Sequence, residues 1–177
     1  MSANPAHALL DRLHGGKTNS IGQALAVAAD VLARPELFDA LLGGLEHEEP
    51  LVRMRSAYAV SKAAAERPDL LQPHKGRFID RLTAPDNSHL CRACLLQAVR
   101  SLTLTPEDIA LLTDLLLDFM HSDSSIVKTF SLHLLVEFAE ADESLRPTVM
   151  PLLWKALETG TPAMRARARK LMKRYRL

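Results

Sequence analysis

The apolar and polar positions of this chain follow a repeating pattern. An apolar helix is followed by a short polar turn, and a second helix then opens with an apolar residue and a base. This apolar–base pair occurs as Val52-Arg53, Cys91-Arg92, Val127-Lys128 and Met164-Arg165, at intervals of 39, 36 and 37 residues. Periods of this length are typical of stacked helical hairpins.

The pattern predicts an all-α protein with ten helices in five hairpins. Sustained alternation of apolar and polar residues is absent and aromatic residues make up 5% of the chain, which argues against strands. The connections are short and no linker-like composition separates them, so we expect one domain over 1–177. The predicted helices are 5–14, 21–33, 36–46, 51–66, 74–84, 89–102, 106–120, 125–141, 146–158 and 163–175.

Helix-start signals support several of these boundaries. Ser20, with Gln23 three residues later, has the form of a capping box. Thr105 before Pro106, with two acids in the first turn, is the clearest start. Proline also stands where a helix is expected to begin at Pro5 (after Asn4), Pro35, Pro50 and Pro162.

Each second helix from residue 51 onward has a face spaced at i, i+4 and i+8 that a lone hairpin cannot cover. Hairpins must therefore stack on one another. The faces are Val52, Ser56 and Val60; Cys91, Leu95 and Val99; Val127, Ser131 and Leu135; and Met164, Ala168 and Met172.

The pattern over 36–177 resembles the HEAT-repeat family more than the armadillo or tetratricopeptide families. The best copy runs from Val149 to Leu171, with Pro151 inside its first helix. The resemblance implies a right-handed α-α superhelix. It also implies a polar ladder between an arginine and an aspartate six residues before it, which only Asp86 with Arg92 fits in full. The other turns carry His47, Ser122 and Thr159.

The HEAT resemblance implies a binding scaffold whose second helices line a concave surface. Aligned on the apolar–base pairs, these helices give three rows: Tyr58, Gln97, His133 and Lys170; Arg55, Cys94, Phe130 and Arg167; and Lys62, Ser101, Glu137 and Arg174. Such rows suit a protein or peptide partner, although a plain solvated face has the same appearance. The candidate partner-binding residues are Arg55, Tyr58, Lys62, Gln97, Arg100, His133 and Lys170.

The net charge of +1 conceals an asymmetry. Residues 163–177 hold seven bases and no acid, whereas the remainder carries 15 bases and 21 acids, a net charge of −6. The last helix therefore offers a second candidate site, for an anionic partner such as nucleic acid, at Arg165, Arg167, Arg169, Lys173 and Arg174. The same bases also suit a solubilising cap of a terminal repeat.

Other chemistry-bearing residues are expected to be structural. Gly15-Gly16-Lys17-Thr18 lacks the first glycine and the strand of a phosphate loop, and is expected to cap a helix. Cys91 and Cys94 lack the further ligands of a zinc site and are expected to be buried. His47, His89 and His121 are expected to be solvated turn residues. Glu137, Glu140, Asp142 and Glu143 are expected to form a solvated acidic corner.

We therefore expect a non-enzymatic binding module without cofactor or metal. A nucleic-acid binder is the second hypothesis, and the acidic remainder of the chain counts against it. Some HEAT-like proteins are DNA-repair glycosylases or bilin lyases, so an enzyme is the third; it would need a pocket with shifted titrations near Trp154 or the central second helices. No stretch suits a membrane span and no secretory signal is visible, which indicates a cytoplasmic protein.

Overall fold

The computed structural model describes residues 5–18 and 20–177, and no strand occurs among them. The predicted all-α class is confirmed. Within this range no helix is long and apolar enough to cross a membrane. The helices are α1 (Pro5–Asp11), α2 (Ala24–Ala33), α3 (Phe38–Gly43), α4 (Pro50–Glu66), α5 (Pro68–Leu71), α6 (Lys75–Thr83), α7 (His89–Val99), α8 (Pro106–Phe119), α9 (Ser125–Ala141), α10 (Arg146–Thr159) and α11 (Pro162–Tyr175).

Most of the predicted boundaries agree with these helices. Proline opens α4, α8 and α11, and Pro151 lies inside α10 as expected. The capping box predicted at the start of α8 is present: Thr105 Oγ1 accepts from the Asp108 amide at 3.2 Å, and Asp108 Oδ2 accepts from the Thr105 amide at 2.8 Å. Local chemistry is enough to define these helix starts.

Three predictions about the helices of the first half are wrong, and one short helix was missed. The first predicted helix, 5–14, ends at Asp11. The Ser20–Gln23 pair is not a capping box, because Ser20 Oγ accepts from the Gly22 amide at 3.1 Å and α2 begins only at Ala24. The predicted helix 36–46 contains a short α3 between two 3-10 turns, η1 (Pro35–Leu37) and η2 (Gly44–Glu46). The short α5, followed by η3 (Gln72–His74), was not predicted. The predicted start at Asn4 lies outside the described residues.

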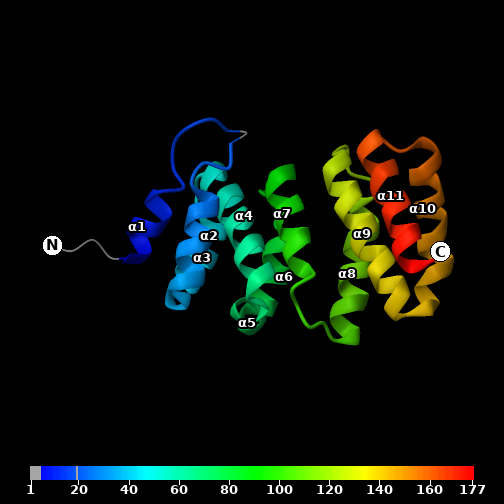
Figure 1. Cartoon of the computed structure of the whole chain (residues 1–177), viewed down its shortest axis with the longest axis horizontal. Coiled ribbons are helices and arrows are strands. Elements are labelled where there is room, and N and C mark those ends of the chain that lie inside the picture. The colour runs from blue at the N-terminus through cyan, green and yellow to red at the C-terminus, as the bar shows by residue number, and fades with distance from the viewer. Residues whose placement is uncertain (1–4, 19) are drawn as a thin grey trace. The chain divides into compact units, whose positions relative to one another are not determined.

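The contacts divide the chain into two compact units, with the boundary between Thr103 and Leu104. Unit 1 is the part up to Thr103. In it, α4 packs against α2 on one side and α7 on the other, and these three helices form one layer (Figure 1). Helix α3 packs on α1 and α4, while α6 packs on α7. In unit 1 the predicted second helices α2, α4 and α7 therefore pack side by side in chain order.

Unit 2 is the part from Leu104 onward. It contains two hairpins, α8 with α9 and α10 with α11, and α9 also packs against both α10 and α11. The short 3-10 segment η4 (Glu143–Leu145) joins the hairpins. Of the five predicted hairpins, four pack as helix pairs: α3 with α4, α6 with α7, α8 with α9 and α10 with α11. The first predicted pair differs, because α1 packs chiefly on α3 and not on α2. That all these helices belong to a single domain stays a prediction.

The predicted apolar faces form the core of each unit. Val52, Ser56 and Val60 are fully buried, and the same holds for Val127, Ser131 and Leu135. Only Met172 is half-buried among the twelve predicted positions. Close packing at the start of α4 requires a residue without a side chain: a Cβ on Gly44 would overlap Ser56 Oγ and lie 2.8 Å from Leu10 Cδ2.

Candidate functional site

Unit 2 has a groove of about 430 Å³ between the first halves of the second helices α9 and α11. We call it the unit 2 groove. Its apolar part includes Ile126, which is 37% exposed, and the half-buried Phe130 ring. Arg167 and Lys170 supply positive charge at one edge. The lining residues are Ser125, Ile126, Thr129, Phe130, Ala163, Ala166, Arg167 and Lys170.

Unit 1 has a groove at the corresponding place. It measures about 260 Å³ and lies between the N-terminal ends of the second helices α4 and α7. Counted from the apolar–base pairs, Leu51 corresponds to Ile126 and Leu90 to Ala163. This unit 1 groove is lined by Thr18, Pro50, Leu51, Met54, Ser88, His89 and Leu90. The same kind of apolar recess therefore recurs between successive second helices.

A series of side-chain contacts connects α9 to α11 beside the unit 2 groove. The Arg167 guanidinium lies 5.6 Å from the centre of the Phe130 ring, and its Nη1 lies 3.3 Å from His133 Nδ1. On the other side of the imidazole, His133 Nε2 lies 3.4 Å from Glu137 Oε1, which also accepts from the Tyr175 hydroxyl at 3.3 Å. These contacts fix the orientation of Arg167 at the groove edge.

His133 is therefore not the exposed recognition residue that the sequence indicated. It is 4% exposed and lies between Arg167 and Glu137. Glu137 and Glu140 are half-buried, so they differ from the solvated corner expected for the end of α9. Both glutamates have basic or hydroxyl neighbours, since Glu140 Oε1 accepts from Arg146 Nη2 at 3.2 Å.

Arg55 is the clearest correction to the predicted binding residues. Its side chain is 2% exposed, and its guanidinium donates to carbonyl oxygens of the 13–20 segment at 2.6 to 3.2 Å. The accepting residues are Leu13, His14, Gly15, Lys17 and Ser20. Arg55 therefore holds a loop and is not available to a partner.

The same geometry explains the glycine-rich segment. Gly15 and Gly16 have positive φ values of 68° and 78°, and α1 has already ended at Asp11. The backbone of this segment turns carbonyl oxygens toward a cation, whereas a phosphate loop turns amide hydrogens toward an anion. Phosphate binding is therefore the wrong chemistry for this segment. The predicted helix cap at Gly15-Gly16 is wrong, because α1 ends at Asp11, four residues before Gly15.

The remaining predicted partner-binding residues are dispersed. Tyr58 and Lys62 are half-buried and close together, with Lys62 Nζ 5.1 Å from the centre of the Tyr58 ring. Gln97 is half-buried and its Nε2 donates to the Ala93 carbonyl at 3.3 Å. Arg100 directly follows the last residue of α7, and its side chain is exposed. Only Lys170 lines a groove, where it lies with Phe130 and Arg167.

Helix α11 presents its bases on either side of a buried stripe, as predicted. Met164, Ala168 and Leu171 are buried, while Tyr175 is half-buried. Arg165 is half-buried and Arg169 and Lys173 are exposed, at a spacing of four residues that places all three on one flank. Arg167 and Arg174 lie on the other flank, and the Arg174 guanidinium is 5.3 Å from the Tyr175 ring centre.

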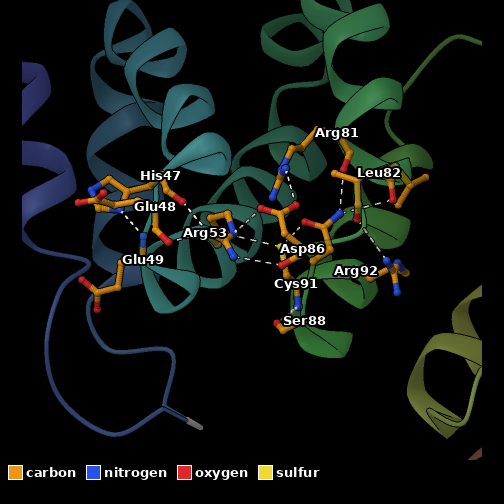
Figure 2. A network of polar contacts seen from close by, with 12 residues as sticks. His47, Glu48, Glu49, Arg53, Arg81, Leu82, Asp86, Ser88, Cys91 and Arg92 are labelled. Carbon is orange, nitrogen blue, oxygen red and sulfur yellow. Dashed lines mark hydrogen bonds and ion pairs between the residues drawn. The ribbon is translucent and has the colours of Figure 1, made fainter.

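A network of polar contacts joins the turn before α4 to the turn before α7 (Figure 2). Arg53 is 7% exposed, and its Nη1 donates to the carbonyls of His47 and Glu48 at 2.7 and 2.8 Å. Arg53 also reaches the next turn, where Nη2 donates to the Asp86 carbonyl at 3.1 Å and Nε lies 3.4 Å from Asp86 Oδ2.

Asp86 therefore pairs with Arg53 of the preceding hairpin, and also with Arg81 at 2.9 Å. We call the contact between Arg53 and Asp86 the ladder pair. The hydrogen bond from Arg81, with help from the charge of Arg53, lowers the pKa of Asp86 below its usual value. Arg92, six residues after Asp86, donates instead to the Ala84 carbonyl at 3.3 Å.

Both cysteines are buried, as predicted, and the Cys91 thiol lies 3.8 Å from the Arg53 carbonyl oxygen. Burial raises the pKa of Cys91 to about 12 and the pKa of Cys94 to about 11. No group of three or more His, Cys, Asp or Glu side chains suited to a metal ion occurs in 5–18 or 20–177. Trp154 is 49% exposed and lines neither of the grooves.

The grooves were predicted only in part from the sequence. Phe130, Arg167 and Lys170 of the predicted rows do line the unit 2 groove. The predicted rows leave out the other apolar residues of the two grooves, which include Leu51, Met54, Leu90, Ile126 and Ala163. A signal was available: Leu90 and Ile126 are large apolar residues directly before an apolar–base pair, outside the predicted buried faces. Both are exposed.

Comparisons with protein-family models, curated proteins and solved structures find no match to this chain.

Proposed function

We propose that this protein is a non-enzymatic binding module of the HEAT type, whose hairpins form an α-α superhelix and whose second-helix surface recognises a protein or peptide partner in the cytoplasm. The observation that carries the proposal is the recurrence of an apolar groove between successive second helices, between α4 and α7 and again between α9 and α11. Recurrent recesses of this kind suit an extended segment that places apolar side chains at intervals.

The unit 2 groove has the composition of a specific recognition site. Phe130 and Ile126 offer apolar area, and Arg167 is held in a fixed orientation by Phe130 and His133. Lys170 adds an exposed positive charge at the same edge. A preoriented arginine loses little conformational entropy on binding, so it favours a partner segment with an acidic residue beside an apolar one.

The test is selection of binding segments from a peptide library displayed on phage, using the full chain as bait. We expect selected peptides to combine apolar and acidic residues, and to lose binding when Ala163→Glu or Ile126→Glu places a carboxylate in the unit 2 groove. Leu111→Glu is the matched control. Leu111 is 56% exposed, belongs to α8, the first helix of the α8–α9 pair, and lies outside both grooves.

Peptides that bind the groove variants and the control variant equally well would exclude the second-helix surface as the recognition site. Failure to select any sequence-specific peptide would count against a peptide-binding module altogether.

A nucleic-acid site on α11 is the second candidate function, and one observation favours it. Arg165, Arg169 and Lys173 follow one flank of α11, and in the described part of the chain none of their side chains makes a hydrogen bond or ion pair. Such a stripe of available cations suits a phosphate backbone.

This candidate predicts retention on immobilised DNA that falls steeply with salt concentration and disappears when Arg165, Arg169 and Lys173 are replaced by glutamate. Replacing the acids Glu36, Asp69 and Glu143 by glutamine is the control, since it makes the net charge more positive without touching α11. The absence of retention at low salt would remove the nucleic-acid candidate.

A further inference from the structure

Unit 2 contains a pocket distinct from the grooves of the second-helix surface. It has a volume of about 310 Å³ and lies where the turns between α8 and α9 and between α10 and α11 meet. We call it the turn-edge pocket. Its apolar lining includes Leu117, Leu152 and Met164, and three groups that carry or can carry positive charge, His121, Lys128 and Lys155, also line it.

The turn-edge pocket lies at the position that the ladder pair fills in unit 1. Lys128 follows Val127 as Arg53 follows Val52, so the two bases occupy equivalent positions. Thr159 stands six residues before Arg165, as Asp86 stands six residues before Arg92. In unit 1 these two positions hold a base and a carboxylate in contact, while in unit 2 they hold a base and a neutral hydroxyl.

Thr159 does not replace the missing carboxylate. Its hydroxyl donates to the Lys155 carbonyl at 3.0 Å, within its own helix. No aspartate or glutamate is among the residues lining the pocket. Within 5–18 and 20–177, neither Lys128 nor Lys155 makes a side-chain hydrogen bond or ion pair. The pocket therefore combines apolar walls with two unneutralised ammonium groups.

We propose that the turn-edge pocket binds a small organic acid, a carboxylate attached to a compact apolar body. The Lys128 ammonium pairs with the carboxylate at the place where Asp86 meets Arg53 in unit 1, and Lys155 adds a second positive charge. The apolar body lies against Leu117, Leu152 and Met164. The volume of about 310 Å³ is at the lower end of the range for small-molecule sites.

The carboxylate site is inferred from the positive charge of the pocket and from the matching sequence positions of the ladder pair in unit 1. A partner on the second-helix surface is not required, because no residue of either groove lines this pocket. Failure of the peptide selection and failure of small-acid binding are therefore separate results.

The first experiment is a titration of the full chain with octanoate, followed by the NMR signals of the methionine methyl groups, with 1-octanol as the uncharged control. We expect saturable shifts of the Met120 and Met164 methyl signals with octanoate, because both residues line the pocket. Octanol should bind about tenfold more weakly or worse, as expected for loss of a charge-assisted hydrogen bond.

Two variants place the binding at Lys128. Lys128→Gln should weaken octanoate binding about tenfold, while Lys128→Arg should retain it. Lys170→Gln is the matched control, because it removes an exposed lysine of the same unit outside this pocket. Equal affinities for Lys128→Gln and Lys170→Gln would overturn the proposal.

A third variant supplies the carboxylate from a side chain of the protein itself. Thr159→Asp restores a carboxylate at the position equivalent to Asp86, so it should pair with Lys128 and abolish octanoate binding while the protein stays folded. Thr159→Asn is the neutral control and should still bind. If octanoate produces no saturable shift, or binds Thr159→Asp as well as the original protein, the pocket is not a carboxylate site.

Discussion

The two units differ in the contacts between the turns of consecutive helix pairs. In unit 1 the turn edge is closed by Arg53, which contacts His47, Glu48 and Asp86. In unit 2 the equivalent positions hold Lys128 and Thr159, and a pocket lies between the turns. The apolar face is buried in both units. Burial of that face is therefore sufficient to stack the hairpins, and the ladder pair adds to it locally.

A second difference concerns the residue two positions after the base. In unit 1 it is Arg55, which is buried and binds the carbonyls of the 13–20 segment. In unit 2 it is Phe130, which lines a groove and contacts Arg167. The same position, counted from the apolar–base pair, thus stabilises a loop in one unit and lines a groove in the other.

The largest expected effect comes from Arg55. Arg55→Met should lower the free energy of unfolding by about 3 kcal/mol or more, because it leaves several carbonyl groups of the 13–20 segment without their donor. Phe130→Met, at the equivalent position of unit 2, should cost about 1 kcal/mol. Urea unfolding followed by circular dichroism measures both. Equal losses would contradict the assigned difference between the two positions.

The next effect compares the two bases at the turn edges. Arg53→Met should cost about 2 kcal/mol, because it removes hydrogen bonds from a buried guanidinium to the carbonyls of His47, Glu48 and Asp86. Lys128→Met should change the free energy of unfolding by less than about 0.5 kcal/mol, since Lys128 has no such contacts. The same urea titration applies. A larger cost at Lys128 would show that its charge already has a structural partner.

A smaller effect is expected from giving unit 2 the pair it lacks. Thr159→Asp should raise the free energy of unfolding by about 0.5 kcal/mol, the size of an exposed ion pair. The gain should vanish in the Lys128→Met background, which a double-mutant cycle measures. A gain that persists without Lys128 would assign the effect to something other than the new pair.

The smallest effect is the pH dependence of Asp86, whose pKa is lowered first by the hydrogen bond from Arg81 and to a lesser extent by the charge of Arg53. The pKa of Asp86 is lowered from 3.8 in the folded protein, so its contribution to stability is complete above that pH. The contribution is lost as the pH falls through the lower folded pKa. Because the Asp86 side chain is about half exposed, the change amounts to a few tenths of a kcal/mol.

Comparing acid unfolding of the original protein with Asp86→Asn measures this contribution. The stability difference between them should shrink as the pH falls below about 4, since protonated aspartate and asparagine are both neutral. A difference that grows toward acid pH would have the wrong sign and would exclude an ionised Asp86 from the pair.

The helices could be predicted because their signals are local. Helix α9 begins and ends at the predicted residues, and Pro106 with its capping box defines the start of α8. The buried faces follow from helical periodicity alone. The short α5 was missed because its four residues are too few to show a period.

The roles of Arg55 and His133 could not be predicted, because they depend on distant parts of the chain. Arg55 binds carbonyls 35 to 42 residues away, and His133 is covered by Arg167, which comes from another hairpin. In the sequence both occupy positions that look solvent-facing. The absence of an acid at Thr159 predicted only an incomplete polar ladder, and the turn-edge pocket itself required the folded chain.

The burial of the two thiols has a practical consequence. Both cysteines of the chain lie in α7 of unit 1, and the sole tryptophan, Trp154, lies in unit 2. The rate at which Cys91 and Cys94 are alkylated therefore measures how fast unit 1 unfolds. The fluorescence of the Trp154 indole follows the unfolding of unit 2. The natural chain thus carries separate reporters for the two halves, and whether they unfold in a single cooperative step can be measured without introducing a label.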